Sequence, residues 1–427
     1  MRKTIALIFA GGRVDELSVL TFHRPKSAVV FGGSYRFIDF ALTNLANCEA
    51  IETVGIMSQY KPSSLIDHVG IGLPWDFVGT HRAVRFLPPY TGPEQAHWYR
   101  GTADALFQNL DFLELHRPTD VLIVSGDHAY TMDYMPLLRF HIERGSDLTM
   151  AFTPMEVDPS RFGIAELDAE GRIMAYAEKP KNPRSNLASM TVFAIKASVL
   201  VDELKRASEA AEGKQGFYIY DEIIPRLVAR RRAHGWVHYG PWEYVRTIDA
   251  YHQVHQDMLG ESPKLDLGAW NVRTNNMSRR AAAPTPSRHL PGAQVSDSII
   301  SAGCAIAGRV ERSVLSPDVR IGKGAVVRNS ILWDGVTVEE GALLDGVIAD
   351  KRTIIGKGAR VGIGEECPPN EELSRSLTCG VTLLGSDVNI PAGTQVGRNC
   401  ILYPHVGADQ LDSGPVASGR TVRAPAR

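Results

Sequence analysis

A pair of glycines, Gly11 and Gly12, directly follows the first apolar run of the chain, residues 4–9. Because glycine has no side chain, such a turn lets backbone N–H groups approach a phosphate closely. The pair taken alone also fits an ordinary tight turn. Two cations that follow, Arg24 and Lys26, would neutralise a bound triphosphate, although each also fits a solvated loop. The opening of the chain is therefore compatible with a phosphate-binding turn.

The elements that would position this turn alternate between short β-branched runs and helical patterns as far as Trp270. Such alternation predicts an α/β domain with a mostly parallel sheet covered by helices. The strand candidates are residues 4–9, 53–57, 120–124, 147–152 and 190–195.

The pattern changes after a segment rich in proline. Residues 279–294 contain three prolines and show neither the strand pattern nor the helical pattern of the preceding residues. This segment is therefore predicted to be a linker after a domain of residues 1–278. In residues 295–412, aliphatic residues recur six positions apart, as from Ile321 to Val327. These hexapeptide repeats predict a parallel β-helix, which we prefer to an antiparallel sandwich with coincidental spacing. Residues 413–427 are predicted to form a disordered tail.

Composition limits the function classes. A chain of 427 residues favours two domains, and its net charge of −2 gives no general attraction to nucleic acid or to an anionic membrane. The N-terminal apolar run is short and lacks a cleavage site, so we interpret it as a buried strand rather than a signal peptide. No apolar stretch approaches the roughly 20 residues of a membrane span. Five scattered cysteines predict neither a disulfide framework nor a zinc site and favour the cytoplasm.

Several segments, in the order in which they occur, resemble those of bacterial ADP-glucose pyrophosphorylases (glucose-1-phosphate adenylyltransferases). The likeness extends over nearly the whole chain, including the repeats. It implies a Rossmann-like nucleotidyltransferase domain followed by a C-terminal left-handed parallel β-helix. The segments that carry it are residues 10–13, 24–29, 31–40, 98–105, 125–130, 161–163, 178–180 and 187–190.

The resemblance implies that a sugar-1-phosphate oxygen attacks the α-phosphorus of a nucleoside triphosphate and displaces pyrophosphate. In such a reaction the protein mainly positions the reactants and stabilises charge. Mg²⁺ is the implied cofactor, because it prefers oxygen ligands and bridges phosphates. We expect a nucleoside triphosphate and a sugar 1-phosphate as substrates, with neither nucleic acid nor a membrane as partner. The flat faces of a β-helix favour a homo-oligomer, preferably a tetramer, or a hetero-oligomer with a paralogue.

The resemblance also assigns roles to individual residues. Asp127 is expected to bind the metal and to act in catalysis together with Lys26 and Arg13. Since a glutamine amide offers both a donor and an acceptor, Gln59 does not by itself select adenine over guanine. The nucleotide is expected at Gly11, Gly12, Gln59, Gly101 and Thr102, and the sugar phosphate at Tyr99, Glu178, Lys179 and Ser189.

Two loops that face the phosphates in relatives are changed. Relatives read Gly-Gly-x-Gly-x-Arg-Leu in the first loop, whereas this chain has Val14 for the third glycine and Glu16 for the arginine. In a later Arg-Asp-Val-Gly-Thr segment, Tyr244 replaces the second metal-binding aspartate and Arg246 replaces the glycine. We hypothesise that Arg246 supplies phosphate-binding charge. Glu243 and Asp249 are the candidates for a replacement metal ligand.

Two further changes concern the sugar and regulation. An acidic-Phe-Gly triplet that lies beside the sugar in relatives is Tyr218-Ile219-Tyr220 here. Apolar and aromatic bulk at this place predicts a preference for a less polar ring than glucose. His23 stands where activator-responsive relatives carry lysine, so we expect no response to a phosphorylated activator at neutral pH.

Three hypotheses about function remain from the sequence. The first is an enzyme that uses ATP or GTP with glucose 1-phosphate or a cyclitol analogue such as valienol 1-phosphate. The second is a catalytically impaired regulatory subunit that partners a paralogue. Retention of Asp127, Lys26 and Lys179 favours the enzyme, whereas Glu16 and Tyr244 favour the subunit. The third, acyl transfer by a histidine of the repeats, His405, is the least favoured.

Overall fold

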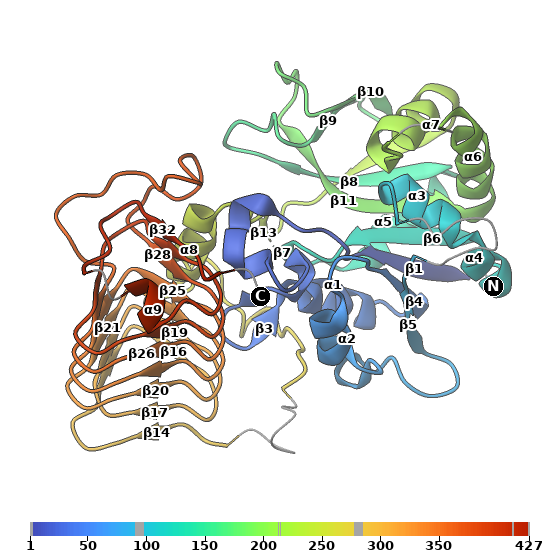
Figure 1. The fold of residues 1–427 in the computed structure, drawn as a ribbon. Coiled ribbons are helices and arrows are strands. Elements are labelled where there is room, and N and C mark those ends of the chain that lie inside the picture. Colours follow the sequence, from blue (N-terminus) through green and yellow to red (C-terminus); the bar gives the residue numbers. More distant parts are fainter. Residues whose placement is uncertain are drawn as a thin grey trace. The chain divides into compact units, whose positions relative to one another are not determined.

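The computed structural model describes residues 3–89, 98–211, 213, 215–276, 285–411 and 414–425 (Figure 1). The chain forms two compact units. The first unit contains residues 1–12 and 37–243, and the second contains residues 13–36 and 244–427. The segments 13–36 and 244–276 thus belong with the repeats, although the sequence placed them in the N-terminal domain. Across the described ranges, no helix is long and apolar enough to cross a membrane.

The first unit is built on a mixed nine-stranded sheet within the described residues. All five strand candidates are confirmed as strands. The pairs β6–β1, β1–β4, β4–β5 and β8–β12 are parallel, as the sequence predicted, whereas β11 runs antiparallel to β6 and β8. The central order is β10 (Ile173–Glu178), β9 (Gly163–Leu167), β11 (Leu187–Lys196), β6 (Asp120–Ser125), β1 (Thr4–Phe9), β4 (Ile51–Met57) and β5 (Ala83–Leu87), and β8 (Leu148–Pro154) joins β11 to β12 (Ala233–Val237).

Helices cover this sheet and complete its core (Figure 1). Ile123 of β6 and Phe193 of β11 belong to one buried cluster with Leu106, Leu200 and Leu227 from three helices. Burial of both faces explains why the central strands are continuous apolar runs rather than alternating ones. The helices are α1 (Phe37–Ala46), α2 (Ser63–Val69), α3 (Thr102–Gln108), α4 (Leu110–His116), α5 (Tyr134–Glu143), α6 (Ala197–Ala210) and α7 (Ile224–Arg230).

The second unit contains the parallel β-helix that the repeats predicted, in the left-handed form that the family resemblance implied, and it is made of three parallel sheets (Figure 1). One sheet contains β14 (Arg288–His289), β17 (Ala305–Ile306), β20 (Arg320–Ile321), β23 (Thr337–Val338), β26 (Ile354–Ile355) and β29 (Asn389–Ile390). The next contains β15 (Gln294–Ser296), β18 (Arg309–Glu311), β21 (Val326–Arg328), β24 (Leu343–Asp345), β27 (Arg360–Val361) and β30 (Gln395–Val396). The third contains β16 (Ile299–Ile300), β19 (Val314–Leu315), β22 (Ile331–Leu332), β25 (Val347–Ala349), β28 (Thr382–Leu384), β31 (Ile401–Leu402) and β32 (Thr421–Val422).

The stacking of equivalent aliphatic residues explains the six-residue recurrence. Val310, Val327, Leu344, Val361 and Val396 pair successively in neighbouring coils, and all five are buried. Each coil alone would leave its apolar face exposed, so the stack is the stable unit.

Two boundary predictions need correction. Residues 285–294 of the predicted linker already form part of the first coil, through β14 and β15, whereas residues 279–284 lie outside the described residues. The predicted disordered tail is wrong for residues 414–425, because β32 pairs with β31 and Val416 N–H donates to Gln395 O at 2.9 Å. The last coil offers unpaired backbone groups, and pairing them outweighs the low hydrophobicity of the tail.

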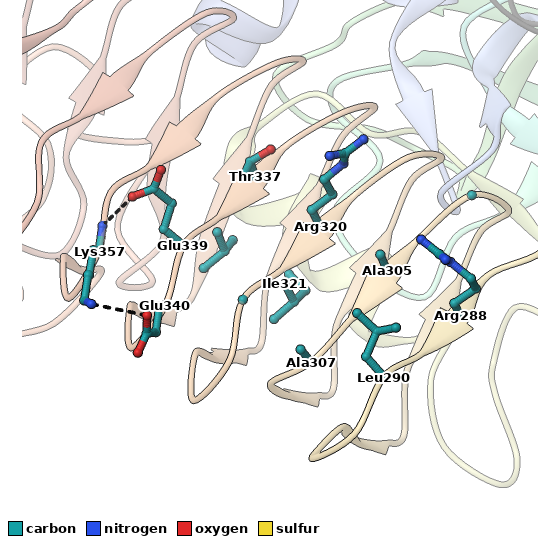
Figure 2. A pocket seen from close by; sticks show the side chains of 13 residues that line it. Arg288, Leu290, Ala305, Ala307, Arg320, Ile321, Thr337, Glu339, Glu340 and Lys357 are labelled. Atoms are coloured by element: carbon teal, nitrogen blue, oxygen red, sulfur yellow. Dashed lines mark hydrogen bonds and ion pairs between the residues drawn. The ribbon is translucent and has the colours of Figure 1, made fainter.

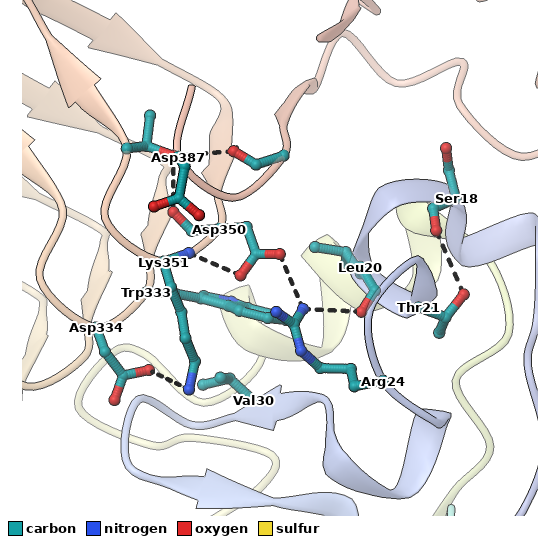
Figure 3. A network of polar contacts seen from close by, with 12 residues as sticks. Ser18, Leu20, Thr21, Arg24, Val30, Trp333, Asp334, Asp350, Lys351 and Asp387 are labelled. Carbon is teal, nitrogen blue, oxygen red and sulfur yellow. Dashed lines mark hydrogen bonds and ion pairs between the residues drawn. The ribbon is translucent and has the colours of Figure 1, made fainter. Parts of the chain in front are cut away.

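A buried ion pair joins residues 13–36 to the β-helix within the second unit (Figure 3). Arg24 Nη1 donates to Asp350 Oδ2 at 2.8 Å, and both side chains are buried. The Arg24 guanidinium also lies 5.0 Å from the ring centroid of Trp333. Lys351 Nζ lies 3.4 Å from Asp334 Oδ2. This network explains why the segment belongs to the second unit.

A cavity of about 640 Å³ lies over one sheet of the β-helix (Figure 2). Arg288, Ala305, Arg320 and Thr337 are neighbours across successive strands on its floor. The described residues that line it include none of the predicted site residues. This cavity is therefore not the predicted nucleotide and sugar-phosphate site.

Candidate active site

The turns after β1 and β6 lie together at one edge of the first unit's sheet. The two strands are parallel with Phe9 opposite Ser125, and Gly126 N–H donates to Phe9 O at 2.9 Å. A Cβ on Gly11 would lie 3.3 Å from Gln59 N, whereas a Cβ on Gly12 would meet no described atom within 4 Å. The glycine turn and the Gly126-Asp127-His128 turn therefore share an edge, with open space beside Gly12.

The Asp127 carboxylate is held by its immediate neighbours. Its Oδ1 accepts a hydrogen bond from Ser125 Oγ and lies 3.3 Å from His128 Nε2. Ser125 and His128 are buried, while the Asp127 side chain keeps partial exposure. One carboxylate oxygen is thus fixed by the protein.

Trp242 selects the tautomer of His128. Trp242 Nε1–H donates to His128 Nδ1 at 3.2 Å, so Nδ1 is an acceptor. A neutral ring then carries its hydrogen on Nε2, which faces Asp127. Trp242 is placed by β13 (Trp242–Glu243), which pairs antiparallel with β7 (Ala129–Tyr130). No motif indicates this relay from Trp242 through His128 to Asp127, because it depends on a strand pairing between residues far apart in the chain.

Lys179 and Glu178, both predicted at the sugar phosphate, are brought together. Lys179 Nζ lies 3.4 Å from Glu178 Oε1, and Tyr176 donates to Glu178 Oε2 at 2.7 Å. Burial and the Glu178 charge raise the pKa of the Tyr176 hydroxyl. Lys179 has a left-handed φ of 45°, and its side chain is 62% exposed. Left-handed backbone is unusual for a lysine, and residues with strained backbone cluster at active sites and ligand-binding turns.

Ser189 lies where β11 departs from regular pairing. The register of β11 against β8 shifts between Ser189 and Phe193, and Thr191 within this irregularity has a φ of 57°. Thr191 N–H donates to Ser189 Oγ at 3.4 Å, and Tyr220 donates to Thr191 Oγ1 at 3.4 Å. Irregularities of this kind redirect side chains beside active sites. Thr191 is a site candidate that the sequence analysis did not identify.

The Gly101–Thr102 turn packs directly on the altered triplet. A Cβ on Gly101 would lie 2.3 Å from Phe217 O, so this position requires glycine. Ile219 N–H donates to Thr102 Oγ1 at 3.0 Å. Ile219 is fully buried, whereas Tyr218 is 46% exposed. The prediction that the whole triplet lines the sugar pocket is therefore wrong for Ile219, which is part of the core.

Gln59 and Tyr99 are bonded to each other. Tyr99 N–H donates to Gln59 Oε1 at 2.8 Å, and Gln59 Nε2 donates to Tyr99 O at 3.2 Å. The buried Tyr99 hydroxyl donates to Leu87 O at 2.9 Å and accepts from Asn109, and burial raises its pKa to about 12. These contacts indicate a supporting role for both residues. Their direct contact with substrate stays a prediction.

Arg13 and Lys26, predicted to act in catalysis, and Asp249, a candidate metal ligand, belong to the second unit. Arg13 Nε pairs with Asp15 Oδ1 at 2.8 Å, and Lys26 is buried with its Nζ 4.4 Å from the ring centroid of Tyr244. Asp249 accepts hydrogen bonds from Thr378 N and Oγ1, the latter at 2.7 Å. Asp249 is thus used in holding the loop after β27, which disfavours it as a replacement metal ligand.

Known proteins resemble this chain over nearly its whole length. The family model described as "Nucleotidyl transferase" matches residues 5–261, and the model "GlmU-like, C-terminal hexapeptide" matches residues 285–384. The glucose-1-phosphate adenylyltransferase of Acetivibrio thermocellus is 37% identical over 428 residues, covering 99% of this chain and 98% of that protein. The protein of the same name from Thermomicrobium roseum is 38% identical over 427 residues, with the same coverage. That from Clostridium beijerinckii is 37% identical over 367 residues, covering 85% and 93%.

Proposed function

Because the chain belongs to the glucose-1-phosphate adenylyltransferase family of nucleotidyl transferases, we propose that it joins ATP to glucose 1-phosphate and releases pyrophosphate. The observation that carries the proposal is the fixed Asp127 carboxylate on the same sheet edge as the Gly11–Gly12 turn. A glycine turn for phosphates beside a held carboxylate is the arrangement that nucleotidyl transfer needs.

In the proposed reaction, a phosphate oxygen of glucose 1-phosphate forms a bond to the α-phosphorus of ATP. The bond from that phosphorus to the bridging oxygen breaks, and pyrophosphate leaves with the electron pair. Backbone N–H groups at Gly11 and Gly12 would donate to phosphate oxygens. Glu178 holds Lys179 Nζ at 3.4 Å, where the ammonium group would bind the sugar phosphate.

The residues present fit a magnesium ion held by a single carboxylate. No cluster of three or more acidic, histidine or cysteine ligands occurs in the part of the chain that the structure describes. Mg²⁺ commonly binds through one or two carboxylates and takes its other ligands from phosphates and water. Asp127 would hold it, and the ion would neutralise phosphate charge when bound. Ser125 and His128 keep the carboxylate in place.

We propose that two tyrosines, Tyr218 and Tyr220, determine which sugar phosphate the site binds. Tyr218 is exposed beside Gly101, and Tyr220 reaches Thr191 at the β11 irregularity. Both present a ring and a hydroxyl, so they offer a polar contact as well as aromatic bulk. We therefore propose glucose 1-phosphate as substrate, with a cyclitol 1-phosphate as the alternative that the test must include.

The test measures pyrophosphate release by the purified full chain with Mg²⁺. ATP and GTP are each offered with glucose 1-phosphate and with valienol 1-phosphate. We expect release with ATP and glucose 1-phosphate, its loss in Asp127→Asn, and its retention in Asp202→Asn, a matched change on α6. Release only with another pair would reassign the substrates. No release with any pair would contradict the proposal and favour a regulatory subunit.

A further inference from the structure

One face of the β-helix carries a row of side chains that point away from its core. The row takes one residue from each of the strands β14, β17, β20, β23, β26 and β29, and strand pairing places consecutive members side by side. The next residues along the strands, such as Ile306, Ile321 and Val338, are buried in the core. We call the row the outer row, and its members in order are Arg288, Ala305, Arg320, Thr337, Ile354 and Asn389.

The side chains of the outer row differ strongly in size. Figure 2 shows the short side chain of Ala305 between the long ones of Arg288 and Arg320. The cavity of about 640 Å³ lies over this half of the row, with Ala305 and Ala307 in its lining. Three strands further along, the larger Ile354 side chain is 39% exposed. The row therefore has a hollow near one end and an exposed aliphatic side chain near the other.

This profile is complementary to its own reverse. A two-fold axis that runs parallel to the strands, between β20 and β23, sets the face of one copy against that of another with the strand order reversed. β17 then faces the partner's β26, so that the partner's Ile354 lies over Ala305 and enters the cavity. In the same way β20 faces the partner's β23, and Arg320 meets the partner's Thr337. Large side chains thus meet small ones on both sides of the axis.

Charge is complementary in the same arrangement. Glu339 directly follows β23 and is exposed, so the partner's Glu339 comes within reach of Arg320. In the part of the chain that the structure describes, the Arg320 guanidinium forms no hydrogen bond or ion pair. Glu339 accepts one hydrogen bond, from Lys357 N at 2.9 Å (Figure 2), and a carboxylate can accept several. The two-fold axis repeats the arginine–glutamate contact, so each pair of copies contains two such contacts.

We propose that the outer row is an interface between two copies of this chain, with Ile354 of each copy seated on Ala305 of the other. Filling the hollow supplies packing contacts that the small side chains lack in a single copy. Every residue of the interface belongs to the second unit, so the interface forms whether or not the chain catalyses the proposed reaction.

Sedimentation velocity of the purified full chain over a range of concentrations tests the interface. We expect the wild-type chain to form a dimer or a larger even-numbered assembly. Ile354→Lys removes one seated side chain from each copy, so it should raise the dissociation constant about 100-fold and halve the mass of the assembly. Ile71→Lys is the matched control, because Ile71 of the first unit is 73% exposed, and it should leave the mass unchanged.

The charged contact has its own test. Arg320→Glu and Glu339→Arg should each weaken the association, because each places two like charges within reach of one another across the interface. The double variant exchanges the charges and should regain part of the lost affinity.

A cysteine pair tests the register directly. Chains carrying Ala305→Cys and chains carrying Ile354→Cys are mixed and mildly oxidised, with the wild-type chain as the background for its own cysteines. Within one chain the two positions lie three strands apart, roughly 14 Å, which no disulfide spans. We expect a covalent dimer from the mixture and none from either variant alone.

The outcomes decide the matter without reference to pyrophosphate release. A wild-type chain that stays monomeric at every concentration would refute the interface. An assembly whose mass is unchanged in Ile354→Lys would refute it too, because another face would then hold the copies together. Absence of the mixed disulfide would exclude this register. A halved mass in Ile354→Lys at unchanged Tm, together with the mixed disulfide, supports the interface, and the disulfide decides if Ile354→Lys lowers the Tm.

Discussion

At the scale of single residues, the site depends on side chains that orient other side chains. Asp127 is positioned by Ser125 and His128, and His128 by Trp242. Each of these contacts restricts the side chain that it holds to one rotamer or one tautomer. Such supporting contacts commonly change metal affinity 10- to 100-fold when removed. Under the proposed function, Trp242 would therefore influence Mg²⁺ binding indirectly, through His128.

Trp242→Phe tests this relay, because it keeps a ring but removes the indole N–H. Without that donor, His128 can adopt the other tautomer, whose Nε2 does not donate to Asp127. We expect the Mg²⁺ concentration for half-maximal pyrophosphate release to rise about tenfold. Trp236→Phe, on β12 of the same unit, is the control. An unchanged Mg²⁺ requirement in Trp242→Phe would show that the relay has no influence on the metal.

Sequence reasoning located correctly those residues whose position in the fold follows from their immediate neighbours in the chain. Gly11, Gly12 and Asp127 follow apolar strands directly, so their position at a sheet edge was predictable. Gln59 and Tyr99 were assigned to substrate, yet their polar atoms bond to the chain itself. Whether a polar side chain faces a ligand or another strand depends on tertiary pairing, which a motif does not encode.

At the scale of elements, α8 (Ile248–Gln256) brings a neutral histidine into the core of the second unit. His255 Nε2 accepts from Gly32 N–H at 3.0 Å, and its Nδ1 lies 2.7 Å from Tyr251 O. Both ring nitrogens are thus used by a neutral ring. Burial lowers the pKa of His255 from 6.5 to about 3, and nearby His252 also lowers it.

This shift predicts how stability depends on pH. Between pH 6.5 and 3 the unfolded chain binds a proton at His255 that the folded chain does not, so His255 makes stability fall as pH falls through this window. Above pH 6.5 the contribution is fully present. Urea unfolding of His255→Gln should show lower stability at pH 7 and a shallower loss between pH 6.5 and 4. An equally steep loss in the variant would assign the acid sensitivity to other groups.

The buried Arg24–Asp350 pair makes a second prediction at this scale. Arg24→Met removes the guanidinium and leaves a fully buried carboxylate, which should cost about 3–5 kcal/mol of unfolding free energy. Arg24→Met with Asp350→Leu should recover much of this loss. The exposed Arg352–Asp387 pair is the control, since Arg352→Met should cost about 1 kcal/mol or less. A double variant as unstable as Arg24→Met would show that the carboxylate is not the cause.

At the scale of the whole molecule, the repeat pattern predicted the β-helix but not its ends. Six-residue recurrence specifies a stack of coils, because each aliphatic residue packs on its equivalent in the next. The segments that complete a stack do not repeat, so residues 13–36 and 414–425 gave no periodic signal. Assignment of residues 13–36 to the second unit follows from contacts such as Arg24–Asp350, between residues 326 positions apart. Periodicity therefore predicted the coils of this unit but not the non-repeating segments that pack against them.

The C-terminal strand closes the last coil, which makes the chain sensitive to truncation. β32 pairs with β31, and Asn370 Nδ2 donates to Gly419 O at 3.2 Å and to Asn399 O at 2.9 Å. Val422 packs against the buried cluster of the β-helix. Removal of residues 414–427 would expose the unpaired edge of β31 and this apolar surface, which invites association between chains.

We expect this truncation to cost about 1.5–3 kcal/mol from lost apolar burial alone, a fall of about 3–12 °C in Tm. Light scattering should show association that increases with protein concentration, because a bare strand edge pairs with another chain. Removal of residues 426–427 alone leaves β32 in place and should change neither quantity. A chain that ends at residue 413 and keeps the Tm and the association state of the full chain would show that β32 does not protect the stack. The β-helix would then be closed by the contacts of its last complete coil, β29 to β31.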